Sequence, residues 1–232
     1  MSLKILRTGS FFLFFAIICI SGDLLLVPVV LLGLNKFKFV QDLCRDLVRI
    51  SWGFFIKVAK NCGRLDYKFE LSELNGGSNL VIANHPSLLD VVFLVSKFKR
   101  INCIVKGELS KNIFLFAAIR ACNYIPNTNN EEFLQKSVEV LKSGENLLIF
   151  PEGTRTKDEI IFHKAAAYIG VKGAKNIVCI GINMHPRSLR KNEPWYKIPD
   201  EKIKYHFKEI KTNLEQNNID DIILWCLYVF KG

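Results

Sequence analysis

The residues Asn79-Leu-Val-Ile-Ala-Asn-His-Pro-Ser-Leu-Leu-Asp90 decide how this 232-residue chain folds. The first five, Asn79–Ala83, form a short segment that is apolar from Leu80 onward, which is typical of a strand buried on both faces of a parallel sheet. A His and an Asp follow, five residues apart. We therefore expect a strand over Asn79–Ala83 and His85 in the turn after it. Pro86 would be the first residue of a helix that carries Asp90 near its start.

Similar apolar runs alternate with helical patterns along the rest of the chain. This alternation predicts an α/β fold: a layered domain with a largely parallel mixed sheet flanked by helices. Further strands are expected at Ile101–Val105, Asn123–Ile125, Asn146–Phe150, Ile177–Asn183 and Lys204–Ile210. Helices are expected at Pro86–Ser96, Leu109–Cys122, Glu131–Lys142, Phe162–Gly170 and Asn218–Lys231.

The stretch from Ser10 to Leu34 is apolar enough to enter a membrane, because crossing the hydrocarbon core takes about 20 apolar residues. Its about 17 Leu, Ile, Val and Phe residues, at about −0.3 to −0.6 kcal/mol each, outweigh Asp23 at about +2.5 to +3.5 kcal/mol. We expect one spanning helix with Asp23 near mid-depth. The alternatives are a shallow hairpin turning at residues 21–23 and a signal peptide, for which a small-x-small cleavage site is missing.

An amphipathic helix is expected at Phe39–Lys60, where apolar residues recur at spacings of three or four. These residues are Val40, Leu43, Leu47, Ile50 and Phe54. The helix would lie on the bilayer or pack on the domain. We accordingly divide the chain into an N-terminal membrane segment, residues 1–38, and a domain over residues 39–232 that this helix leads into.

Composition narrows the class of partner. With 50% hydrophobic and 23% charged residues, the chain is not disordered. The net charge of +10 favours anionic partners such as a membrane surface or phosphates. The basic residues are dispersed, so we expect no nucleic acid. The seven Cys residues lack the CxxC spacing of a metal or redox site, and reduced thiols in a cytosol-facing protein are expected.

The pair His85 and Asp90 has the residue types of the His–Asp half of a catalytic triad. A carboxylate on one ring nitrogen fixes the imidazole tautomer and leaves the other nitrogen as a base. The chain has no GxSxG motif to supply a nucleophile. A substrate hydroxyl would then be activated directly, although both residues could also serve only as helix caps.

A second polar segment, Phe150-Pro-Glu-Gly-Thr-Arg155, follows the strand expected at 146–150. Ligands collect at strand ends in α/β folds. Gly153 permits a left-handed backbone, Arg155 offers a planar fork for phosphate, and Glu152 can accept a hydrogen bond from a substrate hydroxyl or organise the turn. An ordinary polar turn is the alternative.

Together the two segments resemble the glycerolipid acyltransferases, the family of the 1-acylglycerol-3-phosphate acyltransferases. The family motif Asn-His-x-x-x-x-Asp is matched at Asn84, His85 and Asp90, and Phe-Pro-Glu-Gly-Thr-Arg is matched in full at residues 150–155. The resemblance covers about residues 65 to 190, and many members also have a hydrophobic N-terminus. It implies that His85 and Asp90 are catalytic. It also implies a set of substrate-binding residues: Asn84, Lys106, Glu152, Gly153, Thr154 and Arg155.

The activity that this resemblance implies is transfer of a fatty acyl chain from acyl-CoA or acyl-carrier protein to a lipid hydroxyl. The first candidate converts lysophosphatidate to phosphatidate. The reaction needs neither a metal nor a prosthetic group. The partners would be membrane lipid and the acyl donor. The protein would be located at the bacterial inner membrane, with its domain on the cytoplasmic side.

Two positions depart from the family pattern. Asn127 stands where Ile-x-Arg usually places an Arg linked to the acceptor phosphate, and Cys179 stands where a Pro is usual. The sequence resembles a branch that reads Tyr-Ile-x-Asn, whose members tend to accompany bacterial pathways for unusual lipids such as aryl polyenes. The alternatives are therefore a specialised acceptor, a lipid-remodelling transacylase or hydrolase, and a catalytically silent lipid-binding protein.

Overall fold

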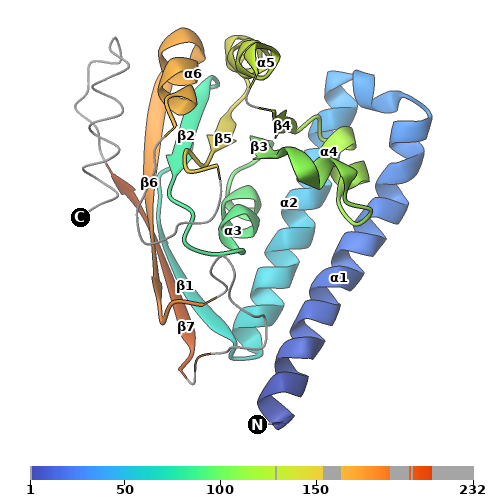
Figure 1. The fold of residues 1–232 in the computed structure, drawn as a ribbon, viewed down its shortest axis with the longest axis vertical. Coiled ribbons are helices and arrows are strands. Elements are labelled where there is room, and N and C mark those ends of the chain that lie inside the picture. Colours follow the sequence, from blue (N-terminus) through green and yellow to red (C-terminus); the bar gives the residue numbers. More distant parts are fainter. Residues whose placement is uncertain (1, 129, 154–162, 189–198, 200, 211–232) are drawn as a thin grey trace.

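A computed structural model describes residues 2–128, 130–153, 163–188, 199 and 201–210 (Figure 1). The helix expected at Asn218–Lys231 lies outside these residues. The described helices are α1 (Ser2–Leu31), α2 (Lys38–Asn61), α3 (Asp90–Lys97), α4 (Phe116–Ala121), α5 (Glu131–Lys142) and α6 (Ala165–Gly173), with short 3-10 turns η1 (Leu34–Lys36) and η2 (Gly107–Lys111).

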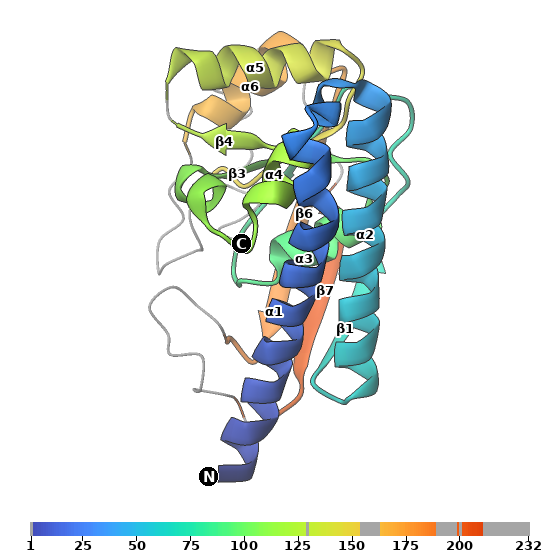
Figure 2. The same cartoon turned by 90° about the vertical axis from the view of Figure 1, so that its right-hand side faces the viewer.

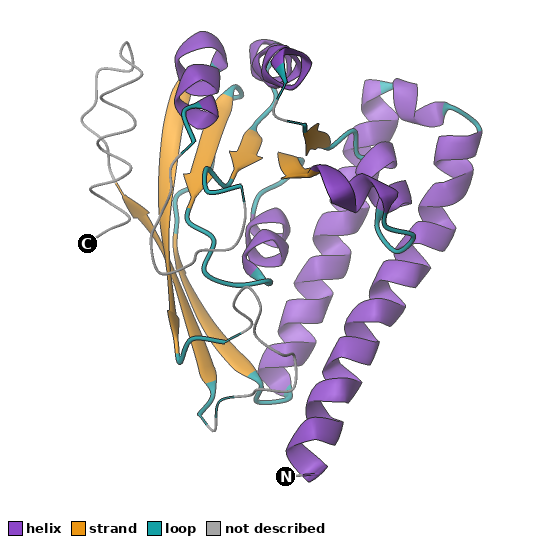
Figure 3. Ribbon diagram, viewed as in Figure 1, coloured by secondary structure: helices purple, strands orange, loops and turns teal. Residues whose placement is uncertain are grey.

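The strands, orange in Figure 3, form one sheet. Their order is β1-β7-β6-β2-β5-β3-β4. Neighbouring strands are parallel except for the antiparallel pair β6 and β7. Their bounds are β1 (Leu65–Glu70), β2 (Asn79–Ala83), β3 (Asn102–Lys106), β4 (Ile125–Asn127), β5 (Leu147–Ile149), β6 (Asn176–His185) and β7 (Ile203–Ile210). The predicted layered α/β fold with a largely parallel mixed sheet is confirmed.

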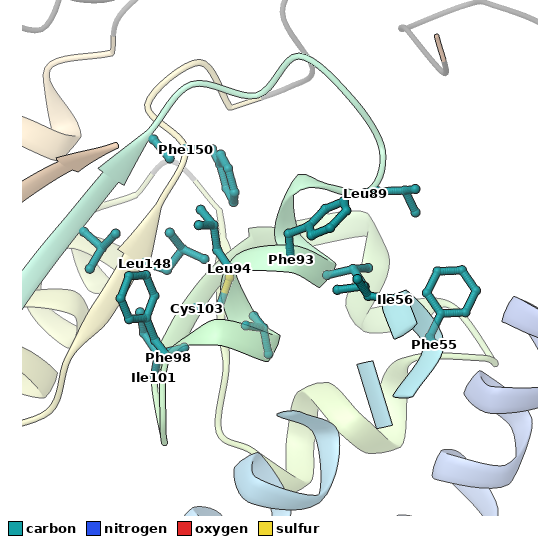
Figure 4. Close-up of a cluster of buried hydrophobic side chains, with 14 of the residues drawn as sticks. Phe55, Ile56, Leu89, Phe93, Leu94, Phe98, Ile101, Cys103, Leu148 and Phe150 are labelled. Atoms are coloured by element: carbon teal, nitrogen blue, oxygen red, sulfur yellow. The ribbon is translucent and has the colours of Figure 1, made fainter. Parts of the chain in front are cut away.

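The core lies on both faces of this sheet because successive side chains of a strand point to opposite faces. All five residues of β2 are buried. Val81 and Ala83 join Leu148 in a cluster under α2 and α3, which Figure 4 shows around Phe93 and Leu94. On the other face, Leu80 and Ile82 belong to a second cluster that includes residues of α5 and α6. A central strand buried on both faces fixes the position of the residues that follow it.

Helix α1 is continuous through residues 21–23. The prediction of one helix rather than a hairpin is therefore confirmed, and its crossing of a membrane stays a prediction. It runs antiparallel to α2 along one side of the domain (Figure 2). Phe11, Phe14 and Phe15 surround Phe55 of α2, with ring centroids 4.8, 5.7 and 5.4 Å away. Asp23 is 7% exposed and accepts a hydrogen bond from the Ala118 N–H of α4 at 3.3 Å. The carboxylate expected at mid-depth of a membrane therefore faces the domain.

Helix α2 matches the expected amphipathic helix and packs on the domain, but its buried face differs from the predicted one. Leu43, Ile50 and Phe54 are exposed. Arg45 is 1% exposed: its Nε donates to the Cys122 carbonyl at 2.9 Å, and its guanidinium pairs with Glu145. This buried polar anchor turns its side of the helix inward. The buried residues of α2 are Gln41, Cys44, Arg45, Phe55, Ile56 and Ala59.

Three expected helices have different bounds. The segment expected as one helix at 109–122 contains the end of η2, an irregular stretch and then α4. The helix expected at 162–170 is α6, Ala165–Gly173. The helix expected from Pro86 begins at Asp90, because residues 85–89 wrap around the Asp90 carboxylate, as the site geometry shows.

Candidate active site

His85 and Asp90 meet just beyond the carboxyl end of β2. The His85 Nδ1 and Asp90 Oδ2 atoms are 2.9 Å apart. The Asp90 side chain is completely buried, and that of His85 is 16% exposed. A carboxylate can only accept hydrogen bonds, so the Nδ1–H group of His85 is the donor to Asp90. In the neutral imidazole the second ring nitrogen, Nε2, then has a lone pair and can act as a base.

The loop between β2 and α3 holds the Asp90 carboxylate with further donors. The Ser87 N–H donates to Oδ2 at 2.7 Å, and the Ser87 hydroxyl donates to Oδ1 at 2.7 Å. Asp90 is also the first residue of α3, where a negative charge is favoured by the helix dipole. The residues of this loop thus hold the Asp90 side chain in place. The prediction that Pro86 is the first helical residue was wrong, because α3 begins at Asp90.

Glu152 holds the main chain of His85. Its Oε1 accepts a hydrogen bond from the His85 N–H at 2.9 Å, and the residue is 6% exposed. The Phe150 ring lies against the imidazole, with centroids 4.5 Å apart and planes 32° apart. The segment after β5 therefore fixes both the backbone and the ring of His85. Acceptor binding by Glu152 stays a prediction.

Gly153 occupies the left-handed region with φ of 62°, a conformation that glycine adopts without steric cost. Its N–H donates to the Phe150 carbonyl at 3.1 Å, which closes the turn. The His163 ring lies against it, because a Cβ built on Gly153 would be 3.6 Å from that ring. Thr154 and Arg155 lie outside the described residues, so their predicted roles stay predictions.

Asn84 ties the loop to the neighbouring strand. Its Nδ2 donates to the Ile182 carbonyl at 2.9 Å, and its Oδ1 accepts from the Ile182 N–H at 2.6 Å. Both groups of the amide are thus used by β6. The structure gives Asn84 a positioning contact, and its predicted contact with substrate stays a prediction.

Lys106 ends β3 at the same edge of the sheet, where the carboxyl ends of the parallel strands meet. It is exposed and pairs with Glu108 at 2.6 Å. Asn127 of β4 is its register partner. A Cβ on Gly107 would be 2.8 Å from the Asn127 carbonyl oxygen, so the chain passes Asn127 closely only because residue 107 is glycine. Asn127 thus lies at the functional edge of the sheet.

Two polar residues of this site were not predicted from the sequence. Ser87 had a local signal, since it stands three residues before Asp90 in the same turn. Tyr205 of β7 had none: its hydroxyl lies 3.1 Å from Ser87 Oγ, although the two residues are 118 positions apart. Only the sheet topology brings them together.

The structure thus brings His85 and Asp90 together at the carboxyl edge of the sheet, in the arrangement that general base chemistry on a hydroxyl requires. Their catalytic role stays a prediction. A family model described as Acyltransferase matches residues 64–186, and the chain belongs to this family. It is therefore an O-acyltransferase, as the resemblance to glycerolipid acyltransferases implied. No curated protein matches the chain.

Among solved structures, the crystal structure of the 1-acyl-sn-glycerophosphate (LPA) acyltransferase PlsC from Thermotoga maritima is similar. Its TM-score is 0.66 at 20% sequence identity, over 99% of this chain and 96% of that chain. At this identity the likeness shows a shared fold, which includes the N-terminal helices as well as the sheet.

Proposed function

We propose that this enzyme is membrane-bound and transfers a fatty acyl chain from an acyl thioester to a lipid hydroxyl, with 1-acylglycerol-3-phosphate as the first acceptor to test. One observation carries the proposal: the His85–Asp90 hydrogen bond leaves Nε2 as a base at the edge where the motif segments meet. The family membership supplies the reaction class. Acyl-CoA or acyl-carrier protein would be the donor, and no cofactor enters the chemistry.

In this reaction His85 Nε2 removes the proton of the acceptor hydroxyl as its oxygen attacks the thioester carbonyl carbon. The tetrahedral intermediate then collapses. Its C–S bond breaks, and the departing thiolate receives from His85 the proton that came from the acceptor hydroxyl. Asp90 keeps its charge throughout and stabilises the imidazolium. General base catalysis of this kind contributes about 10²- to 10⁴-fold in rate.

A specialised acceptor is the second candidate, and Asn127 is the observation that favours it. Asn127 lies at the carboxyl edge of the sheet opposite Lys106, where an amide offers neither a charge nor a guanidinium fork to a phosphate. Asn127→Arg should then shift acceptor preference toward lysophosphatidate. An unchanged acceptor profile would contradict this assignment.

Membrane association rests on the outer surfaces of α1 and α2. Helix α1 is the one described helix long and apolar enough to cross a membrane, over Thr8–Leu31. Its exposed Leu13, Ile17, Ile20, Leu24 and Leu31 fall within an arc of about 60° at 3.6 residues per turn. Exposed Phe39, Leu43, Ile50 and Phe54 form a comparable stripe on α2.

The two stripes adjoin, since the Phe54 and Phe14 rings are 6.0 Å apart. We propose that the helix pair lies in one leaflet with both stripes toward the acyl chains. The net charge of +10 adds attraction to anionic lipid. A bacterial inner membrane with the domain on the cytoplasmic side, where the thioester donors are, fits this placement.

Labelling in sealed vesicles separates this placement from a spanning helix. An impermeant maleimide would be applied to Ser2→Cys protein, with the exposed Cys62 of the domain as the internal reference. Labelling of both positions from one side supports the in-plane pair. Labelling of the two positions from opposite sides would establish a spanning α1 instead.

The acceptor is tested with detergent-purified protein and labelled acyl-CoA or acyl-carrier protein. Lysophosphatidate, glycerol 3-phosphate and a native lipid extract serve as acceptors. His85→Ala tests the proposed base. His163→Ala is its control, because it removes another imidazole, which lies against Gly153. Label in phosphatidate that is lost only with His85→Ala supports the first acceptor. His85-dependent label only in the extract supports a specialised one, and no transfer with any pair would contradict the proposal.

A further inference from the structure

The Tyr205 hydroxyl lies in the protein core next to the candidate dyad. It belongs to β7, which is separated from β2 by β6 (Figure 1) and lies beyond the residues matched by the family model. The residue is 2% exposed, and its hydroxyl oxygen is 3.1 Å from Ser87 Oγ. Ser87 in turn is 2.7 Å from Asp90 Oδ1. A chain of hydroxyl groups thus leads from β7 to the carboxylate that orients His85.

The chemistry of the groups fixes the direction of this chain. Asp90 can only accept, so the hydroxyl proton of Ser87 is directed to Asp90. The Ser87 oxygen then has only lone pairs to offer, and it accepts from the Leu89 N–H at 3.2 Å. Tyr205 must therefore donate to Ser87. Every hydrogen-bonding position of the Ser87 hydroxyl is used, which leaves it one orientation.

The Tyr205 ring is held on several sides. Tyr205 pairs in register with Met184 of β6 and Tyr67 of β1. Its ring centroid is 4.7 Å from that of Phe93, which lies three residues after Asp90 in α3. Burial, together with the nearby Asp90 carboxylate, raises the pKa of Tyr205, so its donor proton is retained at physiological pH.

We propose that Tyr205 is a positioning residue for acyl transfer, acting through Ser87 to hold Asp90 Oδ2 toward the His85 Nδ1–H. This assignment rests on the proposed role of His85 as the general base. At 2% exposure Tyr205 offers almost no surface to a substrate, so its effect would pass through Ser87. Its loss should therefore lower kcat and leave the KM values of donor and acceptor unchanged.

Tyr205→Phe removes only the hydroxyl and keeps the ring in the core. We expect kcat to fall about 3- to 10-fold, the effect of one buried hydrogen bond, with KM values within about 2-fold of wild type. Tyr168→Phe is the control, because Tyr168 is a tyrosine of α6 that is 38% exposed and lies outside the motif segments. It should leave kcat unchanged. An unchanged kcat in Tyr205→Phe would overturn the proposal.

A double-mutant cycle tests whether the effect passes through Ser87. Ser87→Ala should lower kcat, and Tyr205→Phe should cost no further kcat in the Ser87→Ala background. If Tyr205→Phe lowered kcat by the same factor in both backgrounds, its role would be core packing and the proposal would be wrong.

A spectroscopic measurement keeps this inference separate from the proposed function. The Nδ1 proton of a His bonded to a carboxylate resonates far downfield in ¹H NMR, and histidine ¹⁵N labelling with His85→Ala assigns it. We expect this signal to shift or broaden in Tyr205→Phe and to persist unchanged in Tyr168→Phe. An identical signal in Tyr205→Phe overturns the inference. Absence of acyl transfer by wild-type protein would instead count against the proposed function.

Discussion

Replacing Asp90 by Asn removes the charge of the carboxylate while keeping its size. In the wild type, Oδ2 accepts from two donors, the His85 Nδ1–H and the Ser87 N–H, and Oδ1 accepts from the Ser87 hydroxyl. An Asn amide has one oxygen and one NH₂ group. If its oxygen replaces Oδ2, its NH₂ group faces a Ser87 oxygen that already accepts from Leu89 and Tyr205.

The opposite amide orientation directs NH₂ toward His85 Nδ1 and favours the tautomer with the proton on Nε2. The base is then lost in one orientation and weakened in the other. We expect Asp90→Asn to lower kcat about 10³-fold, within the range of general base catalysis. This corresponds to about 4 kcal/mol in the activation free energy at about 1.4 kcal/mol per decade. KM values should stay within about 3-fold, because Asp90 is buried away from substrate.

The assay is initial-rate acyl transfer at saturating donor and acceptor, with thermal unfolding of each variant recorded alongside. Asp66→Asn is the matched control, since Asp66 of β1 is a half-exposed carboxylate that pairs with Lys60 of α2. It should change kcat by no more than about 2-fold. A folded Asp90→Asn protein with kcat within about 3-fold of wild type would refute the proposal that Asp90 orients His85 as the general base.

Three further predictions concern the scaffold. Arg45→Ala leaves Glu145 without its buried guanidinium partner and should lower the free energy of unfolding by about 3–5 kcal/mol in urea titrations, whereas the more exposed Arg49→Ala on the same helix should cost less than about 1 kcal/mol. A loss below about 1 kcal/mol for Arg45→Ala would show that the buried pair does not anchor α2. Gly153→Ala and Gly63→Ala each force an alanine into a positive φ and should each cost about 1–2 kcal/mol of stability, but only Gly153→Ala should raise the acceptor KM; equal KM values would separate the Gly153 turn from acceptor binding. Burial raises the pKa of the Cys103 thiol to about 12, so the folded protein keeps a proton that the unfolded chain releases above pH of about 8.5. The contribution of the protonated Cys103 thiol to the free energy of unfolding is fully present below pH of about 8.5 and is lost as the pH rises toward 12. Cys103→Ala should make the decrease shallower, and an equally steep decrease would contradict the assignment.

The central strand and one surface helix were predictable because their signals are local. The apolar run Leu80–Ala83, with Asn79 before it and Asn84 after it, gives β2 with the predicted bounds. The helix Glu131–Lys142 also has the predicted bounds, since the Asn130 side chain accepts from the Phe133 N–H at one end and Ser143-Gly144 stops it at the other. The strand β1 was not predicted, because its pattern LDYKFE mixes apolar and charged residues and its pairing partner β7 lies 138 positions further along the chain.

The site was predictable where motif and position coincide and not where tertiary structure decides. His85 and Asp90 are brought together as expected. The start of α3 was wrong because Ser87 and His85 bind the Asp90 carboxylate, and this interaction overrides the preference of Pro86 for a first helical position. The buried face of α2 was wrong because Arg45 finds Glu145 and the Cys122 carbonyl, partners that no periodicity of apolar residues shows.

The stoichiometry of thiol release distinguishes His85-dependent acyl transfer from hydrolysis of the thioester. Free thiol and acylated lipid would be measured in the same reaction, with acyl-CoA and the best acceptor, for wild type and for His85→Ala. We expect one thiol released per ester formed, with both products at least 100-fold lower in His85→Ala. Thiol release matched by free fatty acid instead of ester, or ester formation that persists in folded His85→Ala protein, would contradict this expectation.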